Sequence, residues 1–363
     1  MDSTIIIEKS VIILAVFAIT MLMAMYSTLA ERKIAAWLQD RIGPNRAGKG
    51  GILQPLADGL KLFSKEEFFP NTPNKFLFIV GPAIAMSTAL MTSAVIPWGD
   101  KLHLFGRDIL LQATDIDVAL LYIFGVVSVG VYGIMIGGWA SNNKFSLMGA
   151  VRAASQMVSY EVAMGLSMIA LLMMTGTLSL REISAQQAGL HWNVFYQPLS
   201  FLIFLICAFA ETNRTPFDLA ECESELIGGY HTEYSSMKMG FYLFAEYANM
   251  FISSTILAVL FFGGYNYPGM SWAVENWGVN IANVIGIGVL FAKICGFIFF
   301  YMWVRWTIPR FRYDQLMHLG WRILIPLSIV NIVITGIVLL RVEILAALGF
   351  KIVFLIKKLH QIF

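Results

Sequence analysis

The sequence predicts an all-α, polytopic integral membrane protein. Of its 363 residues, 58% are hydrophobic and only 13% are charged, and the mean hydropathy is +0.71. Apolar runs of about 20 residues recur along the chain, and each is long enough to cross a bilayer as a helix. We expect a single membrane domain, residues 1–363, with eight transmembrane helices at residues 10–30, 76–97, 117–140, 152–174, 196–212, 239–263, 281–304 and 319–340.

Apolar runs lie near both ends of the chain. No small-residue cleavage site follows the first apolar run, and Asp2 and Glu8 precede it. It is therefore expected to remain as a membrane span and not to act as a secretory signal. Near the carboxyl end, residues 342–356 form a further apolar run, but it is short and contains Lys351. A possible short ninth span stays open there.

Basic residues are distributed unevenly between the connections. Leaving the carboxyl tail aside, sixteen lie in the odd-numbered connections, whereas the opposite side holds four, Lys9, Lys101, Arg107 and Arg181. Because Lys and Arg are enriched on the cytoplasmic side of membrane proteins, the amino terminus is expected outside and the odd connections on the cytoplasmic or matrix side. The expected location is the bacterial plasma (inner) membrane, or the mitochondrial inner membrane if the source is eukaryotic.

A shorter, amphipathic helix is predicted at about residues 52–66, within the first inner connection. Its apolar residues recur at helical spacing on one side: Ile52, Leu53, Leu56, Leu60 and Phe63. Pro55 fits its first turn. Because the segment is too short and too charged to span, it should lie in the plane of the interface. It serves either as a membrane-surface anchor or as the wall of a passage lined by Asp58 and Lys61.

The third inner connection, residues 212–237, is unusually acidic. Five carboxylates, at its start or within it, fall close together in the sequence: Glu211, Asp218, Glu221, Glu223 and Glu225. On a helix, Glu221 and Glu225 would share a face, and two like charges about 6 Å apart repel by about 3 kcal/mol at an effective dielectric near 20. The group is therefore expected to carry fewer negative charges than it has carboxylates. A plain solvated acidic loop is the alternative.

Ionisable residues also occur inside predicted spans, where they are costly and usually functional. They are Glu161, Glu246 and Lys293. Together with the acidic connection they suggest a polar path from the inner surface to the middle of the membrane. The last inner connection carries Arg310, Arg312 and Asp314; its arginines could contact anionic lipid headgroups or a docked acidic protein surface.

Metal and redox chemistry is not expected from this chain alone. Its three cysteines, Cys207, Cys222 and Cys295, are widely separated and form no Cys-x-x-Cys pair. An iron–sulfur cluster or a zinc site needs several closely placed ligands. We therefore expect no metal site and no cofactor bound by this chain alone.

Several motifs, in order, resemble one known family over about residues 10–340. They are Glu31-Arg32-Lys33, Gln39-Asp40-Arg41-Ile42-Gly43-Pro44-Asn45, Leu53-Gln54-Pro55-Leu56-Ala57-Asp58-Gly59-Leu60-Lys61-Leu62, Lys65-Glu66, Ser159-Tyr160-Glu161, Glu211-Thr212-Asn213-Arg214-Thr215-Pro216-Phe217-Asp218-Leu219, Glu223-Ser224-Glu225-Leu226, Glu233-Tyr234, Ala245-Glu246-Tyr247 and Arg310-Phe311-Arg312-Tyr313-Asp314-Gln315-Leu316-Met317. The chain resembles the membrane subunit of NADH-quinone oxidoreductase (respiratory complex I) that is designated H in bacteria and subunit 1 in mitochondria. Cys222 and His231 depart from the glycine and asparagine that are usual there.

The resemblance implies a membrane subunit that anchors the peripheral arm of a proton-pumping enzyme and forms part of a quinone chamber. Its substrate would be ubiquinone or menaquinone, with iron–sulfur clusters and FMN on partner subunits. The partners would be the peripheral quinone-site subunits, the neighbouring membrane-arm subunits and the lipid bilayer, and no nucleic acid. The resemblance assigns the chamber to Glu31, Arg32, Arg41, Asp58, Lys61 and Phe217. It assigns proton coupling to Glu161, Glu211, Arg214, Asp218, Glu221, Glu223, Glu225 and Glu246; Lys293 joins them on its mid-span position. Docking of the peripheral arm is assigned to Arg310, Arg312 and Asp314.

Other functions fit parts of the pattern. The membrane anchor of an energy-converting hydrogenase would share the fold and handle no quinone. A stand-alone ion transporter is disfavoured because the sequence shows no obvious internal repeat of the kind such carriers have. A purely structural scaffold would leave Glu161, Glu246 and Lys293 without a role.

Overall fold

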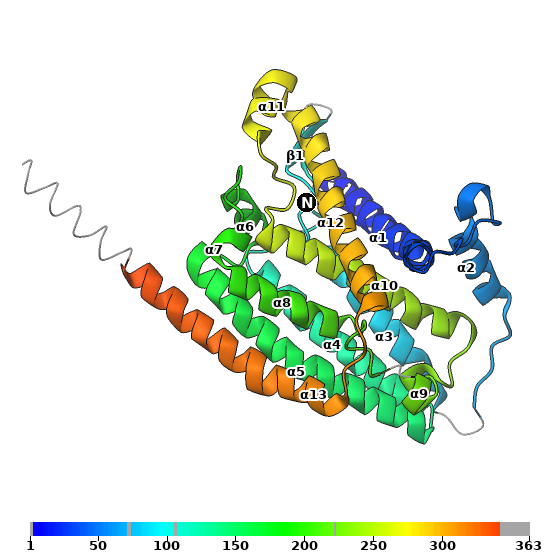
Figure 1. Ribbon diagram of the computed structural model, residues 1–363. Helices are drawn as coiled ribbons and strands as arrows, with labels where there is room; N and C mark the ends of the chain where they lie inside the picture. The colour runs from blue at the N-terminus through cyan, green and yellow to red at the C-terminus, as the bar shows by residue number, and fades with distance from the viewer. Residues whose placement is uncertain (1–2, 71–73, 105–106, 221–222, 342–363) are drawn as a thin grey trace, which may run out of the picture.

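Long helices dominate the computed structural model, which describes residues 3–70, 74–104, 107–220 and 223–341 (Figure 1). The longer helices are α1 (Ser3–Leu38), α2 (Gln54–Ser64), α3 (Lys75–Ser93), α4 (Ala119–Ala140), α5 (Lys144–Thr175), α8 (Pro198–Glu211), α10 (Ser236–Phe261), α12 (Val279–Thr307) and a last helix over Tyr313–Arg341 that begins with α13 (Tyr313–His318) and a π-helical turn, η3 (Leu319–Leu324). The shorter pieces are η1 (Lys49–Gly51), α6 (Leu180–Gln186), α7 (Asn193–Tyr196), α9 (Glu223–Leu226), η2 (Gly229–His231) and α11 (Met270–Trp277). The all-α membrane class is thereby confirmed.

Each of the eight predicted spans falls on a helix, but one of these helices is short. Seven helices in the described part of the chain are long and apolar enough to cross a membrane. The fifth predicted span, 196–212, is α8, which has 14 residues. At 1.5 Å per residue, α8 extends about 21 Å, less than the roughly 30 Å hydrocarbon core. The predicted count of eight transmembrane helices is therefore not confirmed. Residues 342–356, the candidate ninth span, lie outside the described residues.

The predicted inner connections contact one another, so they lie on one side of the bundle. Lys238 at the start of α10 pairs with Glu67 of the first connection. Arg152, in the first turns of α5, pairs with Glu225 of the third connection. The fourth connection reaches the third where the Phe311 amide donates to the Pro216 carbonyl at 3.2 Å. That this side faces the cytoplasm or matrix stays a prediction.

The opposite end of the bundle carries a two-stranded antiparallel hairpin that the sequence patterns did not predict. Strands β1 (Lys101–Leu104) and β2 (Arg107–Leu110) pair with Lys101 opposite Leu110. The Asn280 side chain, at the start of α12, accepts from the His103 amide at 2.8 Å and donates to the His103 carbonyl at 2.9 Å. These two hydrogen bonds resemble those that a neighbouring strand would make, and they fix the hairpin on α12. Figure 1 shows hairpin and α11 together, away from α9.

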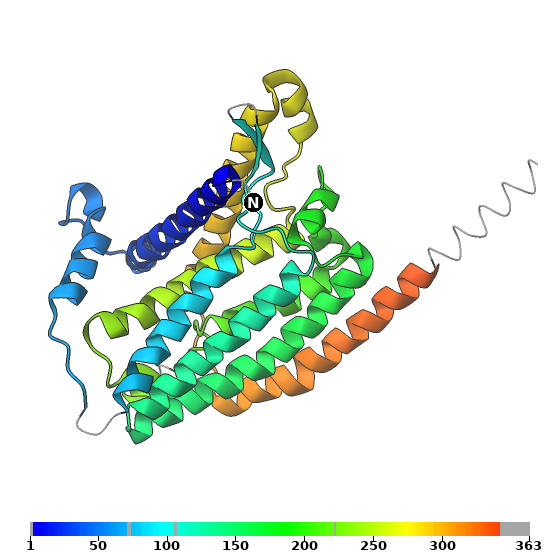
Figure 2. The same ribbon diagram turned by 180° about the vertical axis from the view of Figure 1, so that it is seen from behind.

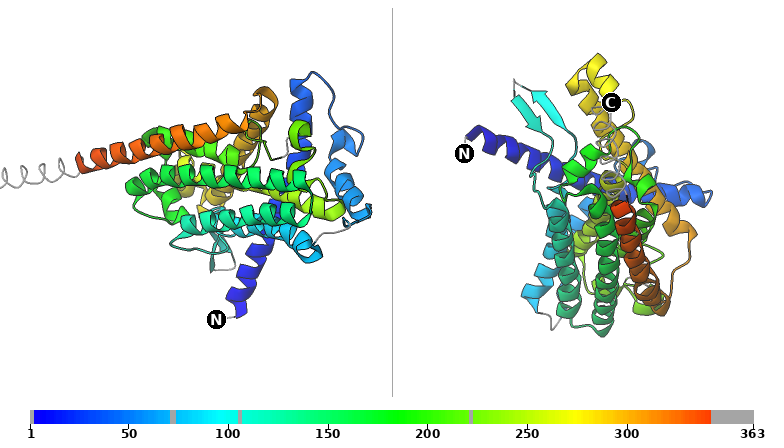
Figure 3. Two further views of the ribbon diagram at one scale, coloured as in Figure 1. Left: turned by 90° about the horizontal axis from the view of Figure 1, so that it is seen from below. Right: turned by 90° about the vertical axis from the view of Figure 1, so that its left-hand side faces the viewer.

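Small residues allow α3 and α4 to pack closely. A Cβ atom added at Gly81 would lie 2.9 Å from the Cα atom of Gly137, and one added at Gly133 would lie 2.9 Å from the Ala85 nitrogen. Close helix contact through glycine is a common way to build membrane interfaces, where lipid and side chains are equally apolar. Figure 2 shows these two helices side by side, with α5 and α13 next to them. Helix α1 crosses this layer steeply (Figure 3).

The predicted amphipathic helix 52–66 is α2, and its polarity is opposite to that of a soluble surface helix. Its apolar residues Leu56, Leu60 and Phe63 are exposed. Asp58 and Lys61 instead face a groove toward α1 and α10. Because an exposed apolar stripe favours lipid contact, the interfacial position predicted from the sequence fits this arrangement.

Candidate functional site

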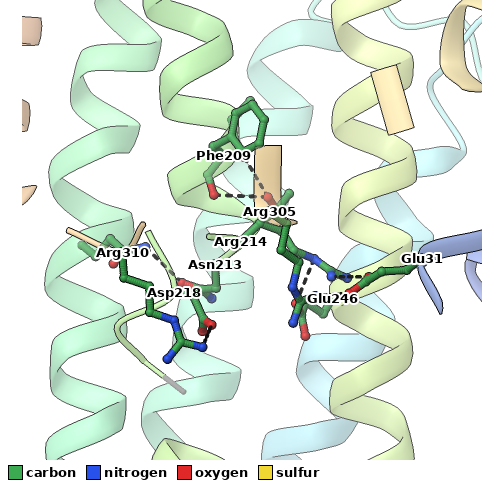
Figure 4. Close-up of polar contacts among 11 residues, drawn as sticks. Glu31, Phe209, Asn213, Arg214, Asp218, Glu246, Arg305 and Arg310 are labelled. Atoms are coloured by element: carbon green, nitrogen blue, oxygen red, sulfur yellow. Dashed lines mark hydrogen bonds and ion pairs between the residues drawn. The ribbon is translucent and has the colours of Figure 1, made fainter. Parts of the chain in front are cut away.

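Arg214 is the centre of a buried ion-pair network. It follows the end of α8, where its amide donates to the Phe209 carbonyl at 3.3 Å, and its side chain is only 2% exposed. Its Nη1 donates to Glu31 Oε2 at 2.7 Å, and its Nε lies 3.0 Å from Glu246 Oε1. Figure 4 shows these side chains converging from α1, α10 and the connection after α8.

The two carboxylates keep the Arg214 guanidinium charged despite its burial. Burial alone would lower the pKa of Arg214, but Glu246 and Glu31 together raise that pKa above its ordinary value. The ring of Tyr247 adds a cation–π contact, with its centroid 4.3 Å from the guanidinium carbon. A charge in this position would be very costly without such partners.

Glu31 also binds a second arginine. Arg305, at the end of α12, places Nη1 2.7 Å from Glu31 Oε1, so each oxygen of this carboxylate has its own guanidinium. Two arginines and two glutamates therefore form one chain, Arg305–Glu31–Arg214–Glu246. The network joins α12, α1, the connection after α8, and α10.

A second ion pair lies at the edge of this network. Arg310 Nη2 is 2.9 Å from Asp218 Oδ2. The Asp218 side chain is 5% exposed, whereas that of Arg310 is 42% exposed. Burial raises the pKa of the Asp218 carboxyl, and the opposing effects of Arg310, Arg305 and Arg214 do not cancel this increase. Asp218 is therefore a buried acid whose charge is sensitive to its surroundings.

Two small cavities lie beside the network and share Glu211. The first, of about 40 Å³, lies between α3, α4, α5 and α10 and is lined by both Glu211 and Glu246. The second is also about 40 Å³, is mostly apolar, and shares Glu211 and Asn249 with the first. A cavity of this size can hold one or more waters. Glu211 Oε2 is buried and has no hydrogen-bond partner among the described residues.

A larger groove opens beside the network, between α1, α2 and α10. Its volume is about 420 Å³, and Arg32, Asp58, Lys61 and Tyr247 line it. Asp58 pairs with Arg32 at 2.7 Å and accepts from Gln54 Nε2 at 3.0 Å. An almost wholly apolar groove of about 470 Å³ adjoins it, with Met25 and Phe244 common to both. The structure thus brings Asp58 and Lys61 to one groove, and a role of this groove as a passage stays a prediction.

The acids of the third connection whose side chains are described have different partners, and the sharing of charge among the whole group stays a prediction. Glu225 pairs with Arg152 at 2.6 Å, and Glu233 accepts from Asn143 Nδ2 at 2.6 Å. Glu225 has its donor from α5, Glu233 has its donor from the N-cap residue of α5, and Asp218 pairs with Arg310 of the fourth connection. Glu221 lies outside the described residues. Glu223 begins α9, but its side chain is not described.

The other predicted residues lie outside the network. Glu161 accepts from the Ser128 hydroxyl and is close enough to Glu211 for their charges to interact. Phe217 is buried between the rings of Tyr160 and Phe311 and does not line the large groove. Arg41 is exposed and donates to the Gln39 side chain. Arg312 and Asp314 are exposed at the start of α13.

Lys293 lies against backbone, not against a carboxylate. Its ammonium donates to the carbonyls of Phe262, Gly264 and Asn266 at 2.7–2.8 Å. These carbonyls follow the end of α10, so Lys293 uses its three donors to cap that helix and the turn after it.

Sequence patterns missed several residues that the structure places at the site. Arg305 was visible only as one of a group of basic residues and Asn249 as part of an apolar span, whereas Tyr247 appeared only as the last residue of the motif Ala245-Glu246-Tyr247 and was given no role. The signal that could have found Tyr247 is its position directly after Glu246. Among the described residues, no group of three or more His, Cys, Asp or Glu side chains is placed to hold a metal ion.

The fold and site define a helical membrane protein in which buried ion pairs join a lateral groove to interior cavities. A family model described as NADH dehydrogenase matches residues 11–336, and the chain belongs to this family. It is similar to the NADH-quinone oxidoreductase subunit designated H in Flavobacterium psychrophilum, with 89% identity over 340 residues, which cover 94% of this chain and 99% of the relative. The corresponding protein of Flavobacterium johnsoniae is 85% identical over 350 residues, 96% and 100% of the two chains. A corresponding protein of Geobacter metallireducens is 46% identical over 325 residues, 90% and 94% of the two chains.

Proposed function

We propose that this chain is the membrane subunit of a proton-translocating NADH:quinone oxidoreductase that forms part of the quinone passage. The groove between α1, α2 and α10 would admit the quinone. The buried carboxylates would couple its reduction to proton movement. Electrons would reach the quinone from centres on partner subunits.

One observation carries this proposal: Tyr247 belongs to both the groove and the ion-pair network. Tyr247 lines the groove, and its ring stacks on the Arg214 guanidinium. The preceding residue, Glu246, contacts Arg214 and lines the first cavity. A charge that appears in the groove is therefore one side chain away from Arg214 and two from the cavity that contains Glu211.

The proposed coupling follows from the charge balance of the network. Quinone reduction by two electrons takes up two protons, so the headgroup passes through states that differ in charge. Arg214, held between Glu31 and Glu246, would respond by strengthening one ion pair at the expense of the other. Glu246 and Glu211 could then exchange a proton through the shared cavity, and Glu161, near Glu211, would continue the path. Buried groups respond strongly because little solvent screens them.

The inner surface supplies the proposed docking site for the peripheral arm. Arg312 and Asp314 are exposed beside the Arg310–Asp218 pair. A peripheral subunit bound there would touch the connection that carries Arg214. Neighbouring membrane-arm subunits would receive the path that leaves Glu161.

The test is photoaffinity labelling of the assembled complex in membranes with a quinone analogue. Label is expected on the groove peptides 54–65 and 239–247, and a quinone-site inhibitor should compete with it. Label confined to other peptides, or unaffected by the inhibitor, would contradict the quinone role. It would favour the hydrogenase-type anchor, which handles no quinone.

A further inference from the structure

In the described part of the connection between α2 and α3, Glu67 and Phe69 both contact one lysine, Lys238 in the first turn of α10. Its Nζ is 2.7 Å from Glu67 Oε1. The same ammonium lies 3.3 Å from the centroid of the Phe69 ring and 5.3 Å from that of Phe78. The Lys238 side chain is 10% exposed, and that of Glu67 is 48% exposed. The mostly buried ammonium of Lys238 therefore contacts the Glu67 carboxylate, the Phe69 ring and, through Phe78, helix α3.

The neighbouring residues fasten the end of α2 itself. The Ser236 hydroxyl donates to the Leu62 carbonyl at 3.0 Å. A Cβ atom added at Gly240 would lie 3.2 Å from Leu62 Cδ1, so the absence of a side chain lets Leu62 approach α10 closely. The last turn of α2 therefore rests on the first turns of α10.

The contacts of Lys238 are better shielded from water than the ion pair on the other side of α2. The Arg32–Asp58 pair joins α2 to α1, but its side chains are 50% and 33% exposed, and exposed pairs contribute little. The Lys238 contacts are more shielded from water and combine an ion pair with a cation–π contact. Of these two charged links among the described residues, the one at Lys238 is therefore the better shielded on its cationic side.

We propose that Lys238 is a positioning residue for quinone entry, because it fixes α2 as a wall of the groove. Leu62, Lys61 and Lys65 of the α2 side face Met239 and Leu243 of α10 across the groove. Lys238 directly precedes Met239 in the sequence and lies about one turn before Leu243, and its side chain pairs with Glu67, just beyond the end of α2. Loss of this link would let the wall move away, so that a quinone tail loses contacts on one side. The inference rests on the proposed function for its substrate and on the geometry for its mechanism.

The first test measures the position of α2 without any quinone. Hydrogen–deuterium exchange would be followed in the intact complex with Lys238→Met, which keeps the length of the side chain and removes its charge. The peptide covering residues 54–70 is expected to exchange at least about threefold faster, because local opening becomes easier. Lys144→Met, which removes a basic residue from the same side at the start of α5, is the matched control. Unchanged exchange in Lys238→Met would overturn the proposal whatever the substrate is.

The second test measures quinone kinetics per assembled complex. With a decyl-tailed quinone that has the ring of the native quinone, Lys238→Met should raise KM about fivefold and leave kcat nearly unchanged, as expected for lost binding alone. Lys238→Arg should restore KM, because a guanidinium can reach Glu67 and stack on Phe69. A merely structural defect would lower the amount of complex and leave KM as it was. Faster exchange with an unchanged KM would instead contradict the quinone role of the groove.

A second variant separates the two parts of the link. Phe69→Leu keeps an apolar side chain and removes the aromatic face. It should give faster exchange and a higher KM than the wild type, although both changes should be smaller than in Lys238→Met. No effect in Phe69→Leu together with a full effect in Glu67→Gln would assign the link to the ion pair alone, with Lys238 still in the positioning role.

Discussion

Arg214 and Glu31 are separated by 183 residues in the sequence and by 2.7 Å between Nη1 and Oε2 in the fold. This contact joins the first span to the connection after α8, and Arg305 binds the other oxygen of the same carboxylate. Three parts of the chain therefore meet at the buried Glu31 carboxylate: the first span, the connection after α8 and the end of α12. Its removal should have consequences for assembly as well as for function.

Replacement of Arg214 by Met is expected to destabilise the protein by about 3–5 kcal/mol, because it leaves Glu246 buried without its cation. The amount of assembled complex and its apparent melting temperature should both fall. Arg46→Met, at an exposed position of the first connection, serves as the control. A melting temperature equal to that of Arg46→Met would mean that the network contributes no net stability.

Glu211→Gln tests the cavity path. The Glu211 Oε2 atom has no hydrogen-bond partner among the described residues, so an amide of equal size should leave assembly intact. Because Gln cannot carry a proton, the rate of proton translocation should fall by at least about tenfold. Proton uptake into vesicles, measured against the rate of NADH oxidation, is the assay. Normal translocation in Glu211→Gln would remove this residue from the path, and Glu275→Gln on the exposed face of α11 is the matched control.

The helical framework could be predicted because it depends on local patterns. The stripe of Leu56, Leu60 and Phe63 requires only the helical period, and α2 follows it. The start of α5 was placed too late because Lys144 and Arg152 made its first turns look like a connection, although Asn143 caps the helix by accepting from the Phe145 amide. A clear local signal was present there and was outweighed by charge.

The partners of the charged residues could not be predicted in the same way. Nothing in the sequence says that Arg305 reaches Glu31, because the contact depends on how α1 crosses α12. The acidic connection was interpreted as a crowd of carboxylates, whereas Glu225 and Asp218 each have an arginine from another connection. Sequence spacing indicates neither of these pairs. The repulsion between Glu221 and Glu225 stays a prediction, because Glu221 lies outside the described residues.

Asp218 should give the complex a measurable pH dependence of stability. Burial raises the pKa of this carboxyl in the folded state, so at pH values between the unfolded and the folded pKa the folded protein binds more protons than the unfolded chain. The stabilisation is fully present below the ordinary Asp pKa of about 3.9 and is lost as pH rises through the raised folded pKa. Asp218→Asn should remove this slope. The apparent melting temperatures of the wild-type and Asp218→Asn complexes should therefore differ by an amount that changes with pH above about pH 4. A difference that stays constant over this range would contradict the role of Asp218 in the pH dependence.

Lys293→Met distinguishes a structural role from proton coupling. The ammonium caps three carbonyls after α10, and their loss of a donor should cost about 1–3 kcal/mol. The apparent melting temperature should fall, and the number of protons moved per NADH oxidised should stay the same. Lys293→Arg, which keeps the charge and the donors, should recover part of the stability. If the proton yield fell in Lys293→Met while stability was unchanged, the residue would belong to the coupling path that its mid-span position first suggested, and the three carbonyls would be the resting contact of a mobile ammonium.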